Sequence, residues 1–112
     1  HARGLPNKCK LLSRQRGYHG VTVAAGSLTG LPYVHDRMGL PLKSVCPAHV
    51  TCPSFYREGR PDETEAQFVQ RLAAELDGAI VANGGAAEVA AFIAEPIQGA
   101  GGVVVPPAGY FA

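Results

Sequence analysis

The clearest pattern of apolar and polar positions runs from Pro61 to Asn83. Phe68, Leu72 and Leu76 recur there at four-residue steps, with Val69, Ala73 and Ile80 beside them. This spacing puts one apolar stripe on a helix, so the stretch is predicted to be an amphipathic helix. We expect the stripe to serve core packing alone.

Both ends of this helix carry signals of their own. Thr64 with Gln67, or alternatively Asp62 with Glu65, offers a capping box at the amino end. Two glycines come directly after the helix and supply its carboxyl-terminal stop. The boundaries of the helix are therefore better defined than those of any other predicted element.

Two short apolar runs predict strands. Glu88–Ile93 is apolar on both faces and lies between glycines and a proline, which suits a buried strand of a parallel sheet. Lys8–Arg14 predicts a second strand, and a helix of small residues should begin near His19–Val21 and stop by Gly30. The order strand, helix, irregular stretch, helix, strand favours an α/β fold with right-handed crossovers.

The remaining segments give weaker signals. Prolines interrupt the stretch from Leu31 to Arg60, where we expect a long loop with a short strand at Ser44–Val45. Residues 102–107 favour a brief strand or an extended loop. Residues 108–112 resemble the opening of a helix.

Composition limits the classes of function. The chain has 112 residues, of which 46% are hydrophobic and 17% charged, and its formal net charge is +1. These values predict one small globular domain or a part of a larger one. The net charge is too small to favour nucleic acid or an anionic membrane as a partner. No apolar run approaches the ~18 residues that a membrane span needs.

Basic residues cluster near the amino end, at Lys8, Lys10, Arg14 and Arg16. No aromatic residues are interleaved with them, and a nucleic-acid patch needs a wider basic face. We therefore interpret the cluster as a solvated strand edge.

The three cysteines, Cys9, Cys46 and Cys52, are odd in number and irregular in spacing. This favours reduced thiols and a cytoplasmic protein. Cys46, His49 and Cys52 stand three residues apart and could suggest a metal site. Prolines crowd them and no fourth ligand is evident, so we expect no metal there.

Glu95 is the candidate for chemistry near the carboxyl end. It follows the apolar run 88–93 and precedes a glycine-rich turn, so it should lie at the carboxyl edge of a parallel sheet, where such sheets bind ligands. A carboxylate there needs hydrogen bonds or a positive partner, such as a cationic ring nitrogen. A structural helix cap or salt bridge is the alternative explanation.

Tyr18 and His19 should reach the same edge, because they follow the first predicted strand. Glycines flank the pair. An aromatic side chain at this place suits stacking on a flat cofactor, and half-buried packing is the alternative. The arrival of Tyr18 and Glu95 at one sheet edge favours a shared ligand site.

Two glycine-rich stretches fail the tests for other chemistries. The glycines of residues 99–102 begin like a dinucleotide-binding loop, but Val104 stands where the third glycine is needed. In "GSLTG", residues 26–30, Ser27 follows a glycine directly, which does not fit a nucleophile elbow.

Two long stretches, "KLLSRQRGYHGVTVAAGSLTG" and "VAAFIAEPIQGAGGVVVPPAGYF", resemble the class III aminotransferases. These are fold-type I enzymes that use pyridoxal 5'-phosphate. The stretch "PSFYREGRPDETEAQFVQRLAAELDGAI" resembles the family's linking region and helix, so the likeness covers nearly the whole chain. It implies that residues 1–112 are the central part of the large cofactor domain, with a mostly parallel sheet and crossover helices.

The resemblance implies cofactor-binding roles for four residues. Tyr18 matches the aromatic that stacks on the pyridine ring, and His19 and Gly20 complete its turn. Glu95 matches the acid that lies near the ring and supports the aspartate bound to the ring nitrogen. Tyr18 and Glu95 would then share one cleft around a planar coenzyme.

The turn that borders the substrate pocket in the family matches Gln98, Gly99, Ala100 and Gly101. Relatives that act on ornithine or 4-aminobutyrate tend to carry a glutamate in place of Ala100, where it pairs with a substrate-binding arginine. The alanine implies the branch that transfers an amino group from an amine or ω-amino acid to a keto acid such as pyruvate. The family's aminomutases usually carry Asn-Met in this turn and fit less well.

Three parts of the family's machinery have no match in the chain. The Schiff-base lysine and the aspartate that holds the pyridinium nitrogen follow the Glu-Pro segment in the family, and the phosphate-binding loop precedes the region matched here. Lys8, Lys10 and Lys43 are the only lysines, and none stands at the catalytic position. The resemblance implies a segment of a longer enzyme that is inactive by itself and holds no catalytic residue.

The family builds its active sites between two subunits, which implies a homodimer or higher homo-oligomer for the parent. The alternative is a non-catalytic, stand-alone α/β binding module derived from the same domain. The flanking sequence would decide between them, because only the enzyme needs an aspartate-bearing strand and a later lysine.

Overall fold

Three parallel strands form the centre of the computed structural model, which describes residues 4–112. The strands are β1 (Lys10–Arg14), β2 (His49–Val50) and β3 (Val89–Phe92), and β1 lies between the other two. Five helices connect them: α1 (Val23–Leu28), α2 (Pro32–His35), α3 (Phe55–Glu58), α4 (Glu65–Ala82) and α5 (Gly85–Glu88). The predicted α/β class with a parallel sheet is confirmed.

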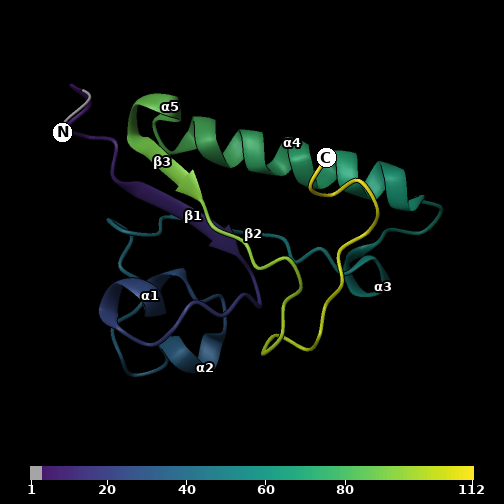
Figure 1. Ribbon diagram of the computed structural model, residues 1–112, viewed down its shortest axis with the longest axis horizontal. Helices are drawn as coiled ribbons and strands as arrows, with labels where there is room; N and C mark the ends of the chain where they lie inside the picture. The colour runs from purple at the N-terminus through teal and green to yellow at the C-terminus, as the bar shows by residue number, and fades with distance from the viewer. Residues whose placement is uncertain (1–3) are drawn as a thin grey trace.

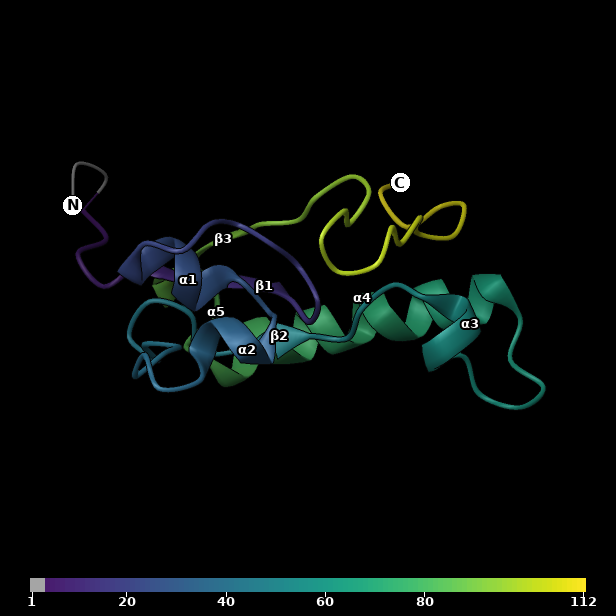
Figure 2. The same ribbon diagram turned by 90° about the horizontal axis from the view of Figure 1, so that it is seen from below.

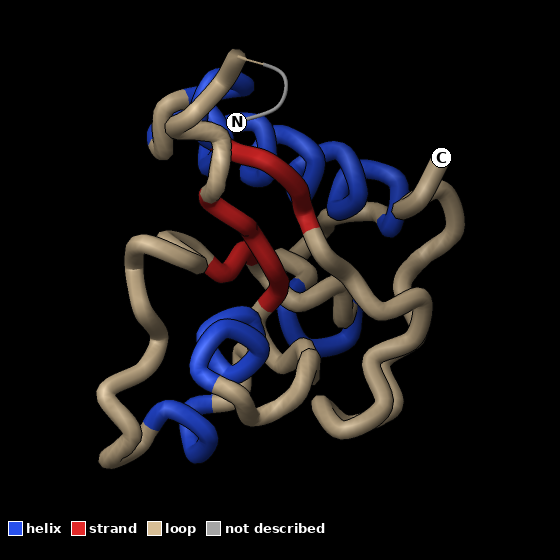
Figure 3. The backbone as a smooth tube through the Cα atoms, turned by 60° about the vertical axis from the view of Figure 1, so that its left-hand side comes forward, coloured by secondary structure: helices blue, strands red, loops and turns tan. Residues whose placement is uncertain are grey.

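The sheet lies between two layers of helices. Figures 1 and 3 show the long helix α4 along one side of the strands and α1 with α2 on the other. The middle strand is buried from Leu12 to Arg14, and Phe68 and Leu72 are the buried residues of α4. None of the described helices is long and apolar enough to cross a membrane.

The predicted helix 61–83 is observed as α4, and its capping box resolves the two alternatives. The Thr64 hydroxyl accepts from the Gln67 backbone N–H at 3.3 Å, and Gln67 Oε1 accepts from the Thr64 N–H at 2.8 Å. Together these bonds satisfy two N–H groups that a helix start leaves without partners. Asp62 instead occupies the turn before the helix, with a φ of 63°.

Two predicted elements are wrong, the strand at Ser44–Val45 and the helix start at residues 108–112. Ser44–Val45 lies in a turn, and the short strand forms at His49–Val50 instead. A strand of two residues is defined by its partner, here Ser13 and Arg14 of β1, and leaves little pattern in its own sequence. The Val45 carbonyl still accepts a hydrogen bond from the Leu11 N–H at 2.8 Å.

Residues 108–112 form turns rather than the start of a helix. The N–H groups of Tyr110 and Ala112 donate to carbonyls three residues back, those of Pro107 and Gly109. Gly109 has a φ of 84°, a left-handed conformation that interrupts a right-handed helix. In the stretch 102–107, Gly102 and Val103 have φ angles of 116° and 53°, and Val104 then pairs with Gln98 in an isolated antiparallel bridge.

Helix α1 starts later than expected, at Val23. Gly20 has a φ of 110°, which a helix does not allow, so the turn after β1 continues past it. Thr22 then caps the helix, its hydroxyl accepting from the Ala25 N–H at 3.3 Å. The later start lengthens the connection that carries Tyr18 and His19.

Candidate functional site

The chain after β1 and the chain after β3 meet at the carboxyl edge of the sheet. Because the strands are parallel, both segments leave the sheet at the same end (Figure 2). Glu95 joins them: its Oε1 accepts from the Tyr18 N–H at 2.8 Å, and its Oε2 accepts from the Gly99 N–H at 3.2 Å. The structure therefore brings together Tyr18, Glu95 and the glycine-rich turn.

A second contact between the two segments requires a glycine. Arg16 Nε donates to the Gly101 carbonyl at 2.8 Å. A Cβ atom added to Gly101 would lie 2.0 Å from the Arg16 carbonyl oxygen, so no side chain fits. The glycine at this predicted pocket position is explained by the close approach of two backbones.

Gln98 lies beneath the turn rather than on its surface. Its side chain is fully buried, and its Nε2 donates to the Gln15 carbonyl at 2.9 Å. Its Oε1 accepts from Cys52 Sγ at 3.3 Å. Gly99 and Ala100, by contrast, are exposed. Of the four predicted pocket residues, these two can meet a substrate directly, while Gln98 supports the turn from below.

Tyr18 and His19 occupy different environments despite being neighbours. The Tyr18 residue is 42% exposed, so its ring is open to a ligand. His19 Nε2 is buried and has no hydrogen-bond partner among residues 4–112. Burial lowers the pKa of His19; nearby Glu95 opposes this effect, and Arg14 adds to it. The lowered pKa favours the neutral imidazole at neutral pH.

Gly20 completes the turn in a conformation suited to glycine. Its φ of 110° is strained for a residue with a side chain. Its carbonyl accepts from the hydroxyl of Thr29 at 2.9 Å. The same hydroxyl accepts from the His19 N–H at 2.9 Å.

Arg14 belongs to this region, which the sequence did not predict. We had interpreted it as part of a solvated strand edge, but the residue is 1% exposed. Its Nη2 donates to the Glu95 carbonyl, and its guanidinium carbon lies 5.6 Å from the Tyr110 ring centroid. Residues two apart in a strand share a face, so the position of Arg14 two residues after Leu12 is the signal that could have indicated an inward side chain.

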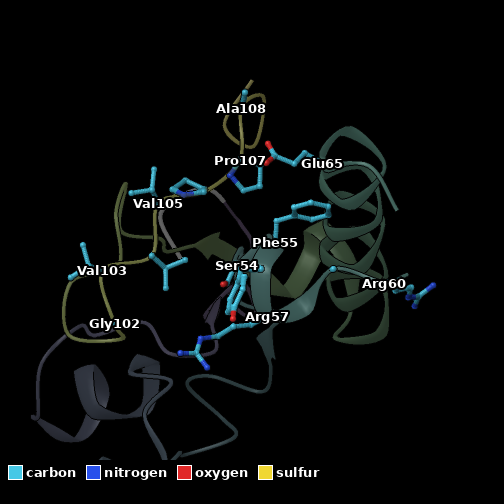
Figure 4. Close-up of a pocket in the computed structure, with 14 residues that line it drawn as sticks. Ser54, Phe55, Arg57, Arg60, Glu65, Gly102, Val103, Val105, Pro107 and Ala108 are labelled. Atoms are coloured by element: carbon cyan, nitrogen blue, oxygen red, sulfur yellow. The ribbon is translucent and has the colours of Figure 1, made fainter. Parts of the chain in front are cut away.

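A hollow of about 800 Å³ lies apart from these residues, between α3 and the segment 102–108. Figure 4 shows Val103 and Val105 on one side of it and Phe55 with Arg57 on the other. None of the eight predicted site residues lines it. The predicted site is therefore defined by its hydrogen bonds and sheet-edge position, not by this hollow.

The cysteine and histidine group 46–52 divides into two environments. Cys46 Sγ lies 3.7 Å from His49 Nε2, whereas Cys52 Sγ donates to Gln98. Burial raises the pKa of both thiols, which favours the protonated form over the thiolate that binds metals. Among residues 4–112, no three His, Cys, Asp or Glu side chains are arranged to hold a metal ion.

Two of the three described lysines, Lys10 and Lys43, bind other groups, and Lys8 is exposed just before β1. Lys10 is at the amino end of β1, the opposite end of the strand, and its Nζ is paired with a Glu88 carboxylate oxygen at 2.6 Å. Lys43 Nζ donates to the Pro47 carbonyl at 3.2 Å, in the loop before β2. Neither amine contacts the Tyr18 turn.

Comparison with known proteins adds an independent line of support. Over residues 1–112 the chain matches the family described as aminotransferase class-III. It is 47% identical over 111 residues to a probable gamma-aminobutyrate transaminase 3, mitochondrial, from Oryza sativa subsp. indica, covering 99% of this chain and 21% of that protein.

Solved structures agree in both sequence and shape. A transaminase with L-alanine is 54% identical with a TM-score of 0.91, over 97% of this chain and 25% of the other. The omega transaminase from Pseudomonas jessenii in complex with PMP is 50% identical with a TM-score of 0.92, over 97% of this chain and 23% of that one. The chain thus spans about a quarter of these structures, and it belongs to the class III aminotransferase family.

Proposed function

We propose that this chain is the central part of the cofactor domain of a transaminase that moves an amino group from an amine or ω-amino acid to a keto acid such as pyruvate. The observation that carries the proposal is the hydrogen bond from the Tyr18 N–H to the Glu95 carboxylate. It joins an exposed aromatic ring and an acid, 77 positions apart in the chain, at the ligand-binding edge of a parallel sheet.

The residues at this edge fit the family's cofactor. Class III aminotransferases use pyridoxal phosphate, which supplies an electron sink when bound. The half-exposed Tyr18 ring offers a stacking face for a flat heteroaromatic group. Glu95 places negative charge beside it, which favours a cationic ring nitrogen. His19 is half-buried and its pKa is lowered by burial, which favours the neutral imidazole and so adds no positive charge against that nitrogen.

The chain's own residues would bind and orient rather than react. Glu95 uses both carboxylate oxygens as hydrogen-bond acceptors from backbone N–H groups, so it fixes the Tyr18 turn against the glycine-rich turn. We also propose that Glu95 supports the aspartate of the family's site. The covalent lysine and that aspartate would come from other parts of the enzyme.

The substrate class rests on Ala100. It is exposed at the predicted pocket border, where a methyl group leaves room for a hydrophobic substituent and adds no charge. The 54%-identical structure holds L-alanine, the amino acid whose keto acid is pyruvate, whereas the rice relative is named for 4-aminobutyrate. An uncharged border favours amines and pyruvate over a site gated by an ion pair.

Assembly and location are proposed with the activity. More than half of the surface of Tyr33, Tyr56 and Val103 is exposed, which favours further protein packed on this chain over a stand-alone binding module. We propose a homodimeric parent in the cytoplasm, which light scattering and cell fractionation would test. The rice relative is named as mitochondrial, and finding this protein in an organelle would contradict the proposed cytoplasmic location.

Cofactor affinity tests the main proposal. In the complete transaminase that carries this segment, Tyr18→Ala should weaken pyridoxal phosphate binding by roughly tenfold, because an aromatic contact of about 0.5–1.5 kcal/mol is lost. Tyr18→Phe keeps the stacking face and serves as the matched control. Equilibrium dialysis of the apo protein gives both dissociation constants. Equal affinity of the Ala variant and the wild type would contradict the proposal.

A further inference from the structure

The segment "SLTG", residues 27–30, runs alongside the turn that carries Tyr18. The Arg16 N–H donates to the Gly30 carbonyl at 2.7 Å, and the Gly30 N–H donates to the Gly17 carbonyl at 2.8 Å. The Thr29 side chain continues the contact toward His19 and Gly20. Residues 16–20 lie outside any strand or helix, so this segment supplies the partners that regular structure would otherwise provide.

One hydroxyl group holds the two peptide groups that follow Tyr18. Thr29 Oγ1 accepts from the His19 N–H and donates to the Gly20 carbonyl, both at 2.9 Å. The Thr29 residue is fully buried, and both bonds are partly buried, so the hydroxyl meets these groups from the protein side. Glu95 binds the N–H of Tyr18 itself. The backbone on both sides of the Tyr18 side chain is thereby fixed.

The hydroxyl is not needed to end helix α1. Thr29 is the C-cap of that helix, and its backbone N–H donates to the Ala25 carbonyl at 2.9 Å. A valine would make the same backbone bond. The side-chain hydroxyl therefore acts on the Tyr18 turn alone.

Gly30 allows the close approach on which this contact depends. A Cβ atom at Gly30 would lie 2.2 Å from the Arg14 carbonyl oxygen and 2.9 Å from the Gln15 Cα. Only glycine lets the segment lie directly against the end of β1. Thr29 is then held at hydrogen-bond distance from His19 and Gly20.

We propose that Thr29 is a positioning residue for the cofactor site: its hydroxyl fixes the Tyr18–Gly20 turn so that the Tyr18 ring is presented to the cofactor. This inference rests on the proposed function, because it takes the Tyr18 ring as the stacking face. Without the hydroxyl, a partly buried N–H and a partly buried carbonyl lose their partner, and the turn must rearrange to satisfy them.

The test compares three variants of the complete transaminase. Thr29→Val keeps the shape and removes the hydroxyl, and Thr29→Ser keeps the hydroxyl. Ser27→Ala is the matched control: this buried hydroxyl on the same helix also makes two bonds, donating to the Val23 carbonyl and accepting from the Leu42 N–H, but neither involves the turn. The readouts are the dissociation constant of pyridoxal phosphate and the thermal midpoint of the apo protein.

We expect Thr29→Val to raise the dissociation constant roughly tenfold and Thr29→Ser to stay within about twofold of the wild type. Ser27→Ala should lower the thermal midpoint and leave the dissociation constant unchanged. An unchanged constant in Thr29→Val, or an equal rise in Thr29→Val and Ser27→Ala, would overturn the inference.

Two further results keep the inference separate from the proposed function. If Tyr18→Ala weakens cofactor binding and Thr29→Val does not, the positioning role is wrong and the proposed function stands. If the wild-type protein binds no pyridoxal phosphate, the proposed function itself fails. Should Thr29→Val not fold, hydrogen exchange in the wild-type apo protein replaces it: the His19 amide should be protected, and rapid exchange of that amide would contradict the role of Thr29.

Discussion

Three buried polar side chains, Arg14, Thr29 and Gln98, hold the candidate site together at the scale of single residues. Each contacts backbone groups of the turns that carry Tyr18 or Glu95. A buried polar group is costly unless it is hydrogen-bonded. Thr29 and Gln98 meet this condition, whereas Arg14 Nε and Nη1 are buried without a hydrogen-bond partner among residues 4–112. The exposed residues Tyr18, Gly99 and Ala100 can then face a ligand from a fixed frame.

Ala100 offers a test of substrate class. In the complete enzyme, Ala100→Glu would place a carboxylate at the pocket border, where it repels the carboxylate of a keto acid. We expect the KM for pyruvate to rise several-fold, since charges about 4 Å apart interact by ~1–4 kcal/mol between water and a protein surface. Steady-state kinetics with Ala100→Gln as the uncharged control would measure it. An equal effect of both variants would show that size, not charge, matters.

His19 predicts a pH dependence of stability. Burial lowers its pKa in the folded protein, so the unfolded chain takes up a proton first as the pH falls below about 6.5. The stability of the apo enzyme should therefore be complete above that pH and decline toward pH 5. In His19→Asn the decline should be shallower, as measured by thermal midpoints across this range. It should not vanish, because burial also lowers the pKa of His49.

The residues of the site differ in how far the sequence reveals them. Tyr18 and Glu95 follow predicted strands, and the rule that parallel strands end at one edge places them together. Arg14 and Thr29 could not be assigned this way, because their roles depend on partners elsewhere in the chain. The partner of Arg14 is 81 positions away, and the two partners of Thr29 are 9 and 10 positions away. For Gln98, the pattern of residues 98–101 predicts a turn but does not reveal that the side chain is buried beneath it.

At the scale of elements, α4 is anchored through its Arg71. The guanidinium binds the Glu63 carboxylate through Nε at 2.7 Å and Nη2 at 2.8 Å, and Nη2 also donates to the Glu58 carbonyl at 2.8 Å. This fork joins α4 to the loop before it and to α3. It fixes the helix that lies along the sheet in Figure 1.

The pair predicts an acid-sensitive anchor. The hydrogen bonds from Arg71 lower the pKa of Glu63 to about 2. Because the folded pKa lies below the unfolded one, the stabilisation is complete above about pH 4.5 and is lost as the pH falls toward 2. Glu63→Gln should remove it at neutral pH. Faster hydrogen exchange at the start of α4 would show this, while unchanged exchange would contradict the role of the pair.

The elements with a long pattern of apolar and polar positions were predicted best. The helix 61–83 was found with its cap, because three apolar steps and a capping box agree. The two predicted strands, 8–14 and 88–93, were found within two residues of their bounds. The second was expected to be buried, but β3 is an edge strand in which Ala90 and Ala91 are exposed and only Val89 is buried. The strand His49–Val50 and the turns at 108–112 depend on partners and on one glycine conformation, so local patterns misplaced them.

At the scale of the whole molecule, we propose that the chain supplies a cofactor-facing edge, while the lysine that binds the cofactor covalently comes from another part of the enzyme. Lys10 is paired with Glu88 at the far end of β1, and Lys43 contacts the Pro47 carbonyl. The separate 112-residue chain, mixed with pyridoxal phosphate and reduced with borohydride, should show no stoichiometric labelling at a single lysine by mass spectrometry. Full labelling of one lysine would show that this chain does hold a covalent site.

The central claim is that Tyr18 and Glu95 form one side of a pyridoxal phosphate site, and a crystal structure of the complete transaminase with this cofactor tests it most directly. The account predicts the Tyr18 ring stacked on the pyridine ring, with centroids within about 4.5–7 Å, and Glu95 bound to the Tyr18 N–H at the same edge. A cofactor bound elsewhere, with the Tyr18 ring in solvent, would contradict it.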